Sequence, residues 1–440
     1  MTFRDLDEIA EEAYHYLYPL VVMEVTKRQL RVVTTPRNDD PRNLFVHQMN
    51  TATDKWRSVA RPNIDTLFSA AWVDLSVGPA MLTLPPAGDR YHMFQMLDFW
   101  TDTFAVPGSR SSGPDGITAK VIGPGWESAR DTNDGEDTVI FCPTPTMWVL
   151  GRTAAQSSDD LERAREFVRG CSVMSLNDGA FADEPSSLSD AERTTAPVAI
   201  VDAMSPAGFF ETAAALLRRE GPHGADGSVL MRLRELGIER GRRFTYTEQS
   251  TEVQAALTAA IPAGRTSILE AARRRDRLVN GWSYSTENIG TWGNNYLRRA
   301  LVARWGIAAN PAEDAVYLQP RADADGNPLD GGNQYVIHFE PGGTPPAKAF
   351  WSLTVYDRNG FLIANDLDRF GIRSRDEVRH NHDGSLDIYL GPDCADPRGD
   401  SNWIPTVAGS LDMSMRIYMP DEEFLTAQWT PPPVRRTDAR

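Results

Sequence analysis

The chain has 440 residues, a length that suits two or three domains or one large two-lobed body. Its 41% hydrophobic and 24% charged residues are ordinary globular values, and they exclude a disordered or fibrous chain. The formal net charge of -16 argues against nonspecific nucleic-acid binding, which depends on neutralising phosphates. Arginine far outnumbers lysine, as high-GC codon usage would produce, although individual arginines remain candidates for binding carboxylate or phosphate.

Three features of the whole chain bear on its compartment. The first twelve residues are acidic and are not followed by an apolar stretch of signal-peptide length. There is no run of 18 consecutive apolar residues, so we expect no membrane span. Cys142, Cys171 and Cys394 are too far apart for a metal-binding CxxC pair and too few for a disulfide framework. These features predict a reduced, cytoplasmic protein.

The amino-terminal third begins with a predicted helix and continues with predicted strands. Apolar residues recur every three or four positions over residues 5–31, and Pro19 is expected to kink or split this helix. From residue 65 to 149 the apolar runs become short and are broken by Gly and Pro, which is typical of antiparallel sheet. The predicted strands are residues 68–75, 80–84, 91–97, 120–122, 139–141 and 147–150.

Helical periodicity returns in the middle of the chain, and strands dominate again towards its end. The helices are predicted at residues 158–170, 205–219, 228–236, 252–260 and 266–280, with residues 171–200 as a connecting loop. The later strands are predicted at residues 335–339, 350–356, 386–390 and 411–418.

This pattern predicts an α+β protein with two β-rich, antiparallel, sandwich- or jelly-roll-like lobes, an N-terminal helix and a helical middle segment. The expected domains are residues 1–170, a helical connection at 171–300, a β domain at 301–430 and a disordered tail at 431–440.

The familiar catalytic signatures are missing from the sequence. It contains no GxSxG elbow, no GxxxxGK[ST] phosphate loop, no HExxH motif and no GxGxxG after a strand. His380 and His382 are two residues apart and would share one face of a strand, so a metal site is one alternative. The following Asp383-Gly384 is more typical of a turn, and we assign no metal ligands and no cofactor.

The segment 61–69 is denser in polar groups than a strand entry requires. Asn63 and Asp65 flank a proline turn, where Asx side chains often cap backbone donors. The alternative is functional: a carboxylate at the mouth of a strand, with Arg61 nearby, suits acid–base work or ligand binding. Both interpretations remain open from the sequence.

A second polar segment covers residues 90–98. Strand alternation puts Tyr91 and Gln95 on one face, and His92 and Asp98 on the other. A buried phenol and amide need hydrogen-bond partners, so Tyr91 and Gln95 either line a pocket or satisfy each other in the core. A polar loop follows this strand, and it adds Trp100 and Arg110 as candidate ligand contacts.

The carboxyl-terminal strands supply the last candidates. Trp351 and Tyr356 lie in the segment 350–358, and Arg416 shares a face of the final predicted strand with Tyr418. Aromatic residues in such strands are more often core than ligand platforms.

The same segments carry a family resemblance. They are RPNIDTLFSAAWVDL at 61–75, RYHMFQMLD at 90–98, FWSLTVYD at 350–357, NWIP at 402–405 and RIY at 416–418. The chain resembles the two-domain family of unknown function with the 1254-type domain at the amino end and the 1214-type domain at the carboxyl end. The resemblance implies β-rich lobes and makes self-association plausible. Phe68 and His92 stand where members commonly carry Tyr, which implies a substrate different from that of typical members.

We therefore expect an enzyme that acts on a small organic molecule by hydrolase- or lyase-like chemistry, without a redox or nucleotide cofactor. In this hypothesis Asp65 is the general acid or base, and His92 or Asp98 is a second titrating group. Arginines 61, 110 and 416 are candidate carboxylate clamps. The alternatives are a non-catalytic binder of small molecules or lipids and a metal-dependent enzyme. The expected partner is a small-molecule substrate, not nucleic acid or a membrane.

Overall fold

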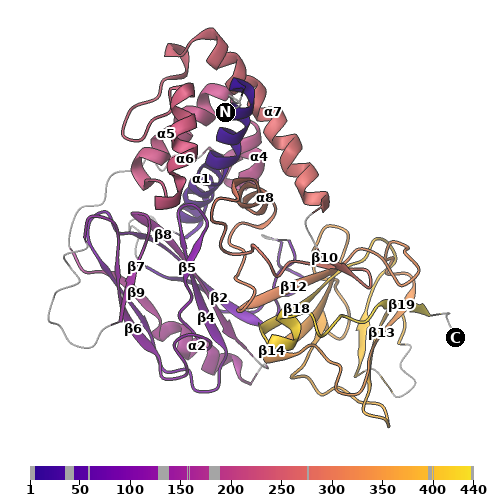
Figure 1. Cartoon of the computed structure of the whole chain (residues 1–440). Coiled ribbons are helices and arrows are strands. Elements are labelled where there is room, and N and C mark those ends of the chain that lie inside the picture. The colour runs from indigo at the N-terminus through magenta and orange to yellow at the C-terminus, as the bar shows by residue number, and fades with distance from the viewer. Residues whose placement is uncertain are drawn as a thin grey trace.

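A computed structural model of the chain describes residues 5–34, 44–57, 60–126, 138–155, 157, 159–177, 189–274, 277–394, 399 and 401–437. Two β lobes lie side by side, and a layer of helices stands at one end, packed on the amino-terminal lobe (Figure 1). This arrangement confirms the predicted α+β class with two β-rich regions and an N-terminal helix.

The amino-terminal lobe is a sandwich of two sheets. One sheet has the order β1-β2-β8-β4-β5 and consists of Val46–Gln48 (β1), Thr66–Asp74 (β2), Thr146–Ala154 (β8), His92–Asp98 (β4) and Thr103–Ala105 (β5). The other has the order β7-β6-β3-β9 and consists of Thr138–Phe141 (β7), Ile117–Ile122 (β6), Ala80–Leu84 (β3) and Ser172–Ser175 (β9). Alternate residues of both sheets, among them Leu67, Phe94 and Leu82, fill the core between them, together with helix α2 (Leu161–Gly170).

The helical layer is built around α1 (Leu6–Thr34). It contains α4 (Pro197–Asp202), α5 (Pro206–Glu220), α6 (Gly227–Leu233), α7 (Thr251–Arg274) and α8 (Tyr296–Gly306), with α3 (Asp190–Thr194) beside it. Helix α1 is not split at Pro19, because buried contacts on all sides hold it. Helix α7 also continues through Pro262, where two helices were predicted, and a Cβ at Gly264 would lie only 2.3 Å from the Tyr14 ring of α1. Among the described residues, no helix is long and apolar enough to cross a membrane.

The carboxyl-terminal lobe is a second sandwich. Its larger sheet has the order β10-β11-β12-β18-β14-β15: Arg277–Val279, Trp282–Tyr284, Ala315–Pro320, Asp412–Pro420, Ala347–Tyr356 and Gly371–Arg373. Its smaller sheet has the order β17-β16-β13-β19: Trp403–Pro405, Leu386–Gly391, Gln334–Phe339 and Val434–Thr437. A short helix, α9 (Glu422–Leu425), follows β18.

Three local predictions need correction. The end of the chain is not a disordered tail up to residue 437, because β19 pairs with β13 and buries Val434 in the core of the lobe. Residues 277–279 form strand β10 instead of extending a helix. The predicted loop 171–200 contains β9, α3 and α4. In each case contacts with distant parts of the chain determine the secondary structure of a segment whose own hydrophobic periodicity is weak.

Candidate functional site

One face of the larger carboxyl-terminal sheet is polar and turns towards the amino-terminal lobe. Along β14, Trp351, Leu353 and Val355 enter the core of their own lobe, so the alternate residues face the other way. The strand register aligns a row across four strands on this second face, made of Tyr317, Arg416, Ser352 and Arg373. We call the place where this face meets the amino-terminal lobe the junction.

Asp65 is the carboxylate of the junction, and its side chain is completely buried. Ser352 Oγ donates to Asp65 Oδ2 over 2.6 Å, and Tyr418 Oη donates to the same oxygen over 3.1 Å. Arg373 Nε donates to Oδ1 over 3.3 Å. Burial, together with the Asp65 charge, raises the pKa of Tyr418, so this phenol stays protonated. Asp65 thus joins the two lobes through three side-chain hydrogen bonds.

Asn63 holds the turn that presents Asp65. Its Oδ1 accepts the Asp65 backbone N–H (2.6 Å), and its Nδ2 donates to Tyr418 Oη (2.8 Å). Arg61, just before the turn, has a left-handed backbone with a φ of 52°. Its backbone carbonyl accepts a hydrogen bond from Arg416 Nη2 (3.1 Å), and Tyr356 Oη donates to the Pro62 carbonyl (3.0 Å). The turn is therefore clamped by the carboxyl-terminal lobe.

Arg152 faces the junction from β8 of the amino-terminal lobe. Its cross-strand neighbours are Phe68 on β2 and Met93 on β4, and its guanidinium carbon lies 6.0 Å from the Phe68 ring centroid. Burial and the nearby Arg416 charge act to lower the pKa of Arg152, but the neighbouring Tyr317, Tyr418 and Tyr91 outweigh them, and its pKa is raised overall. Within the described part of the chain it has no hydrogen-bond or ion-pair partner. Arg152, Phe68 and Tyr317 are all partly exposed, so solvent reaches this side of the junction.

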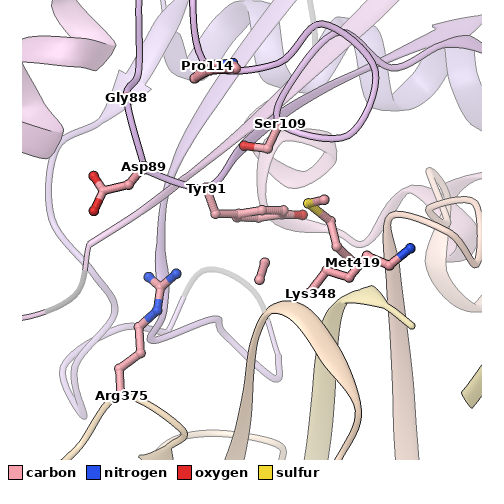
Figure 2. A pocket seen from close by; sticks show the side chains of 9 residues that line it. Gly88, Asp89, Tyr91, Ser109, Pro114, Lys348, Arg375 and Met419 are labelled. Atoms are coloured by element: carbon pink, nitrogen blue, oxygen red, sulfur yellow. The ribbon is translucent and has the colours of Figure 1, made fainter. Parts of the chain in front are cut away.

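A pocket of about 190 Å³ opens on another side of the junction (Figure 2). Tyr91 lies across it, and Asp89 and Arg375 line it from opposite lobes (Figure 2). The Arg375 guanidinium lies 4.5 Å from the Phe350 ring centroid, and burial lowers the pKa of Arg375. The Tyr91 ring contacts the rings of Phe350 and Tyr418, with centroids 5.6 and 5.5 Å apart. One aromatic layer therefore separates this outer pocket from Asp65.

The structure brings together part of the predicted site. Asn63, Asp65, Tyr356 and Arg416 converge at the junction, and Tyr91 borders it. Arg61 contributes its carbonyl, whereas its half-exposed side chain pairs with Asp412 (2.6 Å).

The other predicted residues lie elsewhere. Arg110 is held by Asp314 in a two-pronged ion pair (2.7 and 2.9 Å). Gln95 donates to Thr103 Oγ1 and to the Ala309 carbonyl, both at 2.8 Å. Trp351 fills the core of the carboxyl-terminal lobe, Trp100 packs into the helical layer, and His92 packs against Phe167 on the opposite face of β4.

Asp98 belongs to a second buried cluster, between β4 and the helical layer. Its Oδ2 lies 2.5 Å from His223 Nε2, and Arg299 Nη2 lies 3.0 Å from Asp102 Oδ2. Among the described residues, Asp98, Asp102 and His223 offer a grouping of potential metal ligands, and His380 and His382 are not part of it. Arg299 Nη2 is also 3.4 Å from His223 Nδ1, so a guanidinium already supplies positive charge there. The cluster suits an internal ion network better than a metal.

Sequence reasoning missed several residues of the junction. Ser352, Arg373 and Tyr317 gave no local signal, because only the register of four strands aligns them with Arg416. Arg152 did give a signal: it is an arginine inside the otherwise apolar strand 146–154. A charged residue in such a strand needs either a partner or a ligand.

The fold and junction define a two-lobed β protein with a helical cover and a polar interface between its lobes. Residues 42–175 match the family described as Protein of unknown function (DUF1254), and residues 314–422 match Protein of unknown function (DUF1214). The chain therefore belongs to the two-domain family that its sequence resembles.

Two solved structures are similar to this chain, and the first supports its fold. The crystal structure of the VPA0106 protein from Vibrio parahaemolyticus is similar with a TM-score of 0.75 and 20% identity, covering 99% of this chain and 100% of that one. An uncharacterized protein from Burkholderia cenocepacia has a TM-score of 0.46 and 12% identity, covering 97% and 88%. Comparison with curated proteins gives no match.

Proposed function

We propose that the protein is an enzyme that acts on a small organic molecule at the junction, by acid–base chemistry of the hydrolase or lyase type. The observation that carries this proposal is the buried Asp65 carboxylate, bound between the lobes by Ser352, Tyr418 and Arg373. Carboxylates placed in this way among cations and hydroxyls are common sources of acid–base groups. The free Cys142, Cys171 and Cys394 support a cytoplasmic place of action within the same proposal.

In this proposal each group has a defined task. An aspartate offers about four acceptor positions, and three are used here, so Asp65 keeps capacity at Oδ1 to take a proton. Hydrolysis and elimination both build negative charge on a substrate atom, and fixed donors lower the barrier most when they already point at that charge. Arg152 and Tyr317 are the groups on the solvent-accessible side of the junction, and they would supply those donors.

A non-catalytic binding protein is the second candidate. The observation that favours it is the complete burial of the Asp65 side chain, which gives a ligand no direct path to this carboxylate unless the lobes move. In that case Asp65 fastens the lobes together and the outer groups alone contact the ligand.

The test is turnover by Asp65→Asn. Purified wild-type protein is incubated with a library of small esters, amides and hydroxy acids, and substrate loss is followed by mass spectrometry. We expect conversion by wild type, loss of conversion in Asp65→Asn, and retained conversion in the control Asp412→Asn, which removes a nearby carboxylate that binds Arg61 instead. Equal turnover by Asp65→Asn, or no conversion of any compound by wild type, would contradict the enzyme proposal and favour the binder.

A further inference from the structure

The junction holds more positive than negative charge. Arg152, Arg373 and Arg416 face it. Asp65 is hydrogen-bonded to Arg373 and places its charge near Arg416, and Asp376 lies 3.6 Å from Arg373 Nη1. Arg416 is buried and uses its two Nη groups on Thr354, Tyr356 and the Arg61 carbonyl, none of which carries a negative charge. Like charges held together away from bulk water repel strongly. Three guanidinium groups thus meet two carboxylates, Asp65 and Asp376, and a bound anion would balance the remaining positive charge.

Hydrogen-bond donors point to the same place. Tyr317 Oη accepts a hydrogen bond from Asn310 Nδ2 (2.8 Å), and within the described residues its own proton has no acceptor. Arg152, which interacts with this hydroxyl, has all its N–H groups available. These two neighbouring donors, on the side of the junction that solvent reaches, are groups that an anionic ligand would satisfy.

The walls around these donors are apolar and aromatic. Phe68 lies under the Arg152 guanidinium, Met93 flanks Arg152 on β4, and Tyr91 and Phe350 close the side towards the outer pocket. A guanidinium binds a carboxylate through two parallel hydrogen bonds, and apolar walls favour a ligand with a hydrocarbon body over a hydrated inorganic ion.

We propose that Arg152, assisted by the Tyr317 hydroxyl and the positive charge of Arg416, binds the carboxylate of a small organic acid at the junction. This proposal names the substrate class of the proposed function. It depends on the proposed function only for the location of the site, because binding can be measured without turnover. Arg152 becomes the main specificity-determining residue, whereas Asp65 is held by Tyr418 and its other partners.

The experiment uses the full-length protein and benzoate as the probe, with benzamide as its uncharged match, in low-salt buffer. Thermal unfolding and titration calorimetry are measured for wild type, Arg152→Gln and the control Arg242→Gln, whose side chain is 74% exposed in the helical layer. We expect benzoate, but not benzamide, to raise the melting temperature of wild type and of the control. In Arg152→Gln the Kd for benzoate should rise about tenfold or more, as loss of a charge-assisted hydrogen bond implies.

Other outcomes overturn the assignment. Equal effects of benzoate and benzamide on wild type, or an unchanged Kd in Arg152→Gln, would show that the junction does not bind a carboxylate. Loss of binding in Arg375→Gln alone would place the anion in the outer pocket. Stabilisation by inorganic phosphate as strong as that by benzoate would replace the organic acid with a general anion. If Arg152 binds benzoate but no library compound is converted, only the enzyme proposal fails.

Discussion

The protein contains two buried polar clusters that differ in charge balance. In the cluster of the helical layer, Asp98 and Asp102 face His223 and Arg299, and the Arg299 guanidinium also lies over the rings of Trp100 and Tyr296. At the junction, Arg373 and Arg416 lie near Asp65, and Arg152 has no carboxylate partner among the described residues.

The difference separates two uses of buried charge. A balanced network that joins secondary-structure elements stabilises the fold, and breaking it leaves an uncompensated charge. A cluster with surplus charge and unused donors lowers its energy by binding a ligand of opposite sign. The three predictions below test this contrast.

The largest expected effect comes from removing the cation of the balanced cluster. Arg299→Met keeps most of the side-chain volume but leaves Asp102 without its buried guanidinium partner. We expect a loss of about 3–5 kcal/mol in the free energy of unfolding, the range typical when one partner of a buried ion pair is removed. Urea denaturation at pH 7 followed by circular dichroism measures it, with exposed Arg242→Met as the control. A loss below about 1 kcal/mol, the value of a surface ion pair, would contradict the buried network.

The second effect is a pH dependence of stability that requires His223. Burial lowers the pKa of His223, but the hydrogen bond and charge of Asp98 outweigh it, and the pKa is raised overall; Arg299 and Asp102 also face the ring. Burial raises the pKa of Asp102 to about 6. A group whose pKa is higher in the folded than in the unfolded state stabilises the protein at low pH. This contribution is lost as the pH rises through the folded-state pKa.

We therefore expect the melting temperature of wild type to fall between pH 6 and pH 8 more steeply than that of His223→Gln. Thermal unfolding of both proteins in matched buffers at pH 6, 7 and 8 measures the difference. Parallel curves of melting temperature against pH would show that His223 is not ionised within the network. The description of this cluster as balanced in charge would then be wrong.

The sequence predicted the strands and the polar turn well, because alternation and Asx residues are local signals. It grouped Asn63 and Asp65 in one polar turn, which the structure places beside Tyr418, and through strand alternation it put Arg416 and Tyr418 on one face. It could not pair Arg110 with Asp314, 204 residues away, and so treated a structural ion pair as a ligand clamp.

The lack of local signals for long-range contacts also explains why the predicted boundaries of α7 and β19 were wrong. Beyond Pro262, α7 packs through Gly264 closely against Tyr14 of α1, and β19 pairs with the edge of β13. Such contacts join distant segments, and no local pattern encodes them.

The smallest expected effect is also the most specific to the junction. Arg152→Gln removes no hydrogen bond or ion pair among the described residues and relieves repulsion from Arg416, so the free energy of unfolding without ligand should stay within about 0.5 kcal/mol of wild type or rise. Arg416→Gln, the matched comparison on the same face, loses bonds to Thr354, Tyr356 and the Arg61 carbonyl and should cost about 1.5–3 kcal/mol or more. Urea denaturation of both variants measures the contrast. If Arg152→Gln destabilises the protein as much as Arg416→Gln, then Arg152 supports the fold and the junction is a second structural network. If Arg152→Gln does not destabilise the protein in this way, saturating benzoate should make wild type more stable than Arg152→Gln, because only wild type gains binding energy in the folded state.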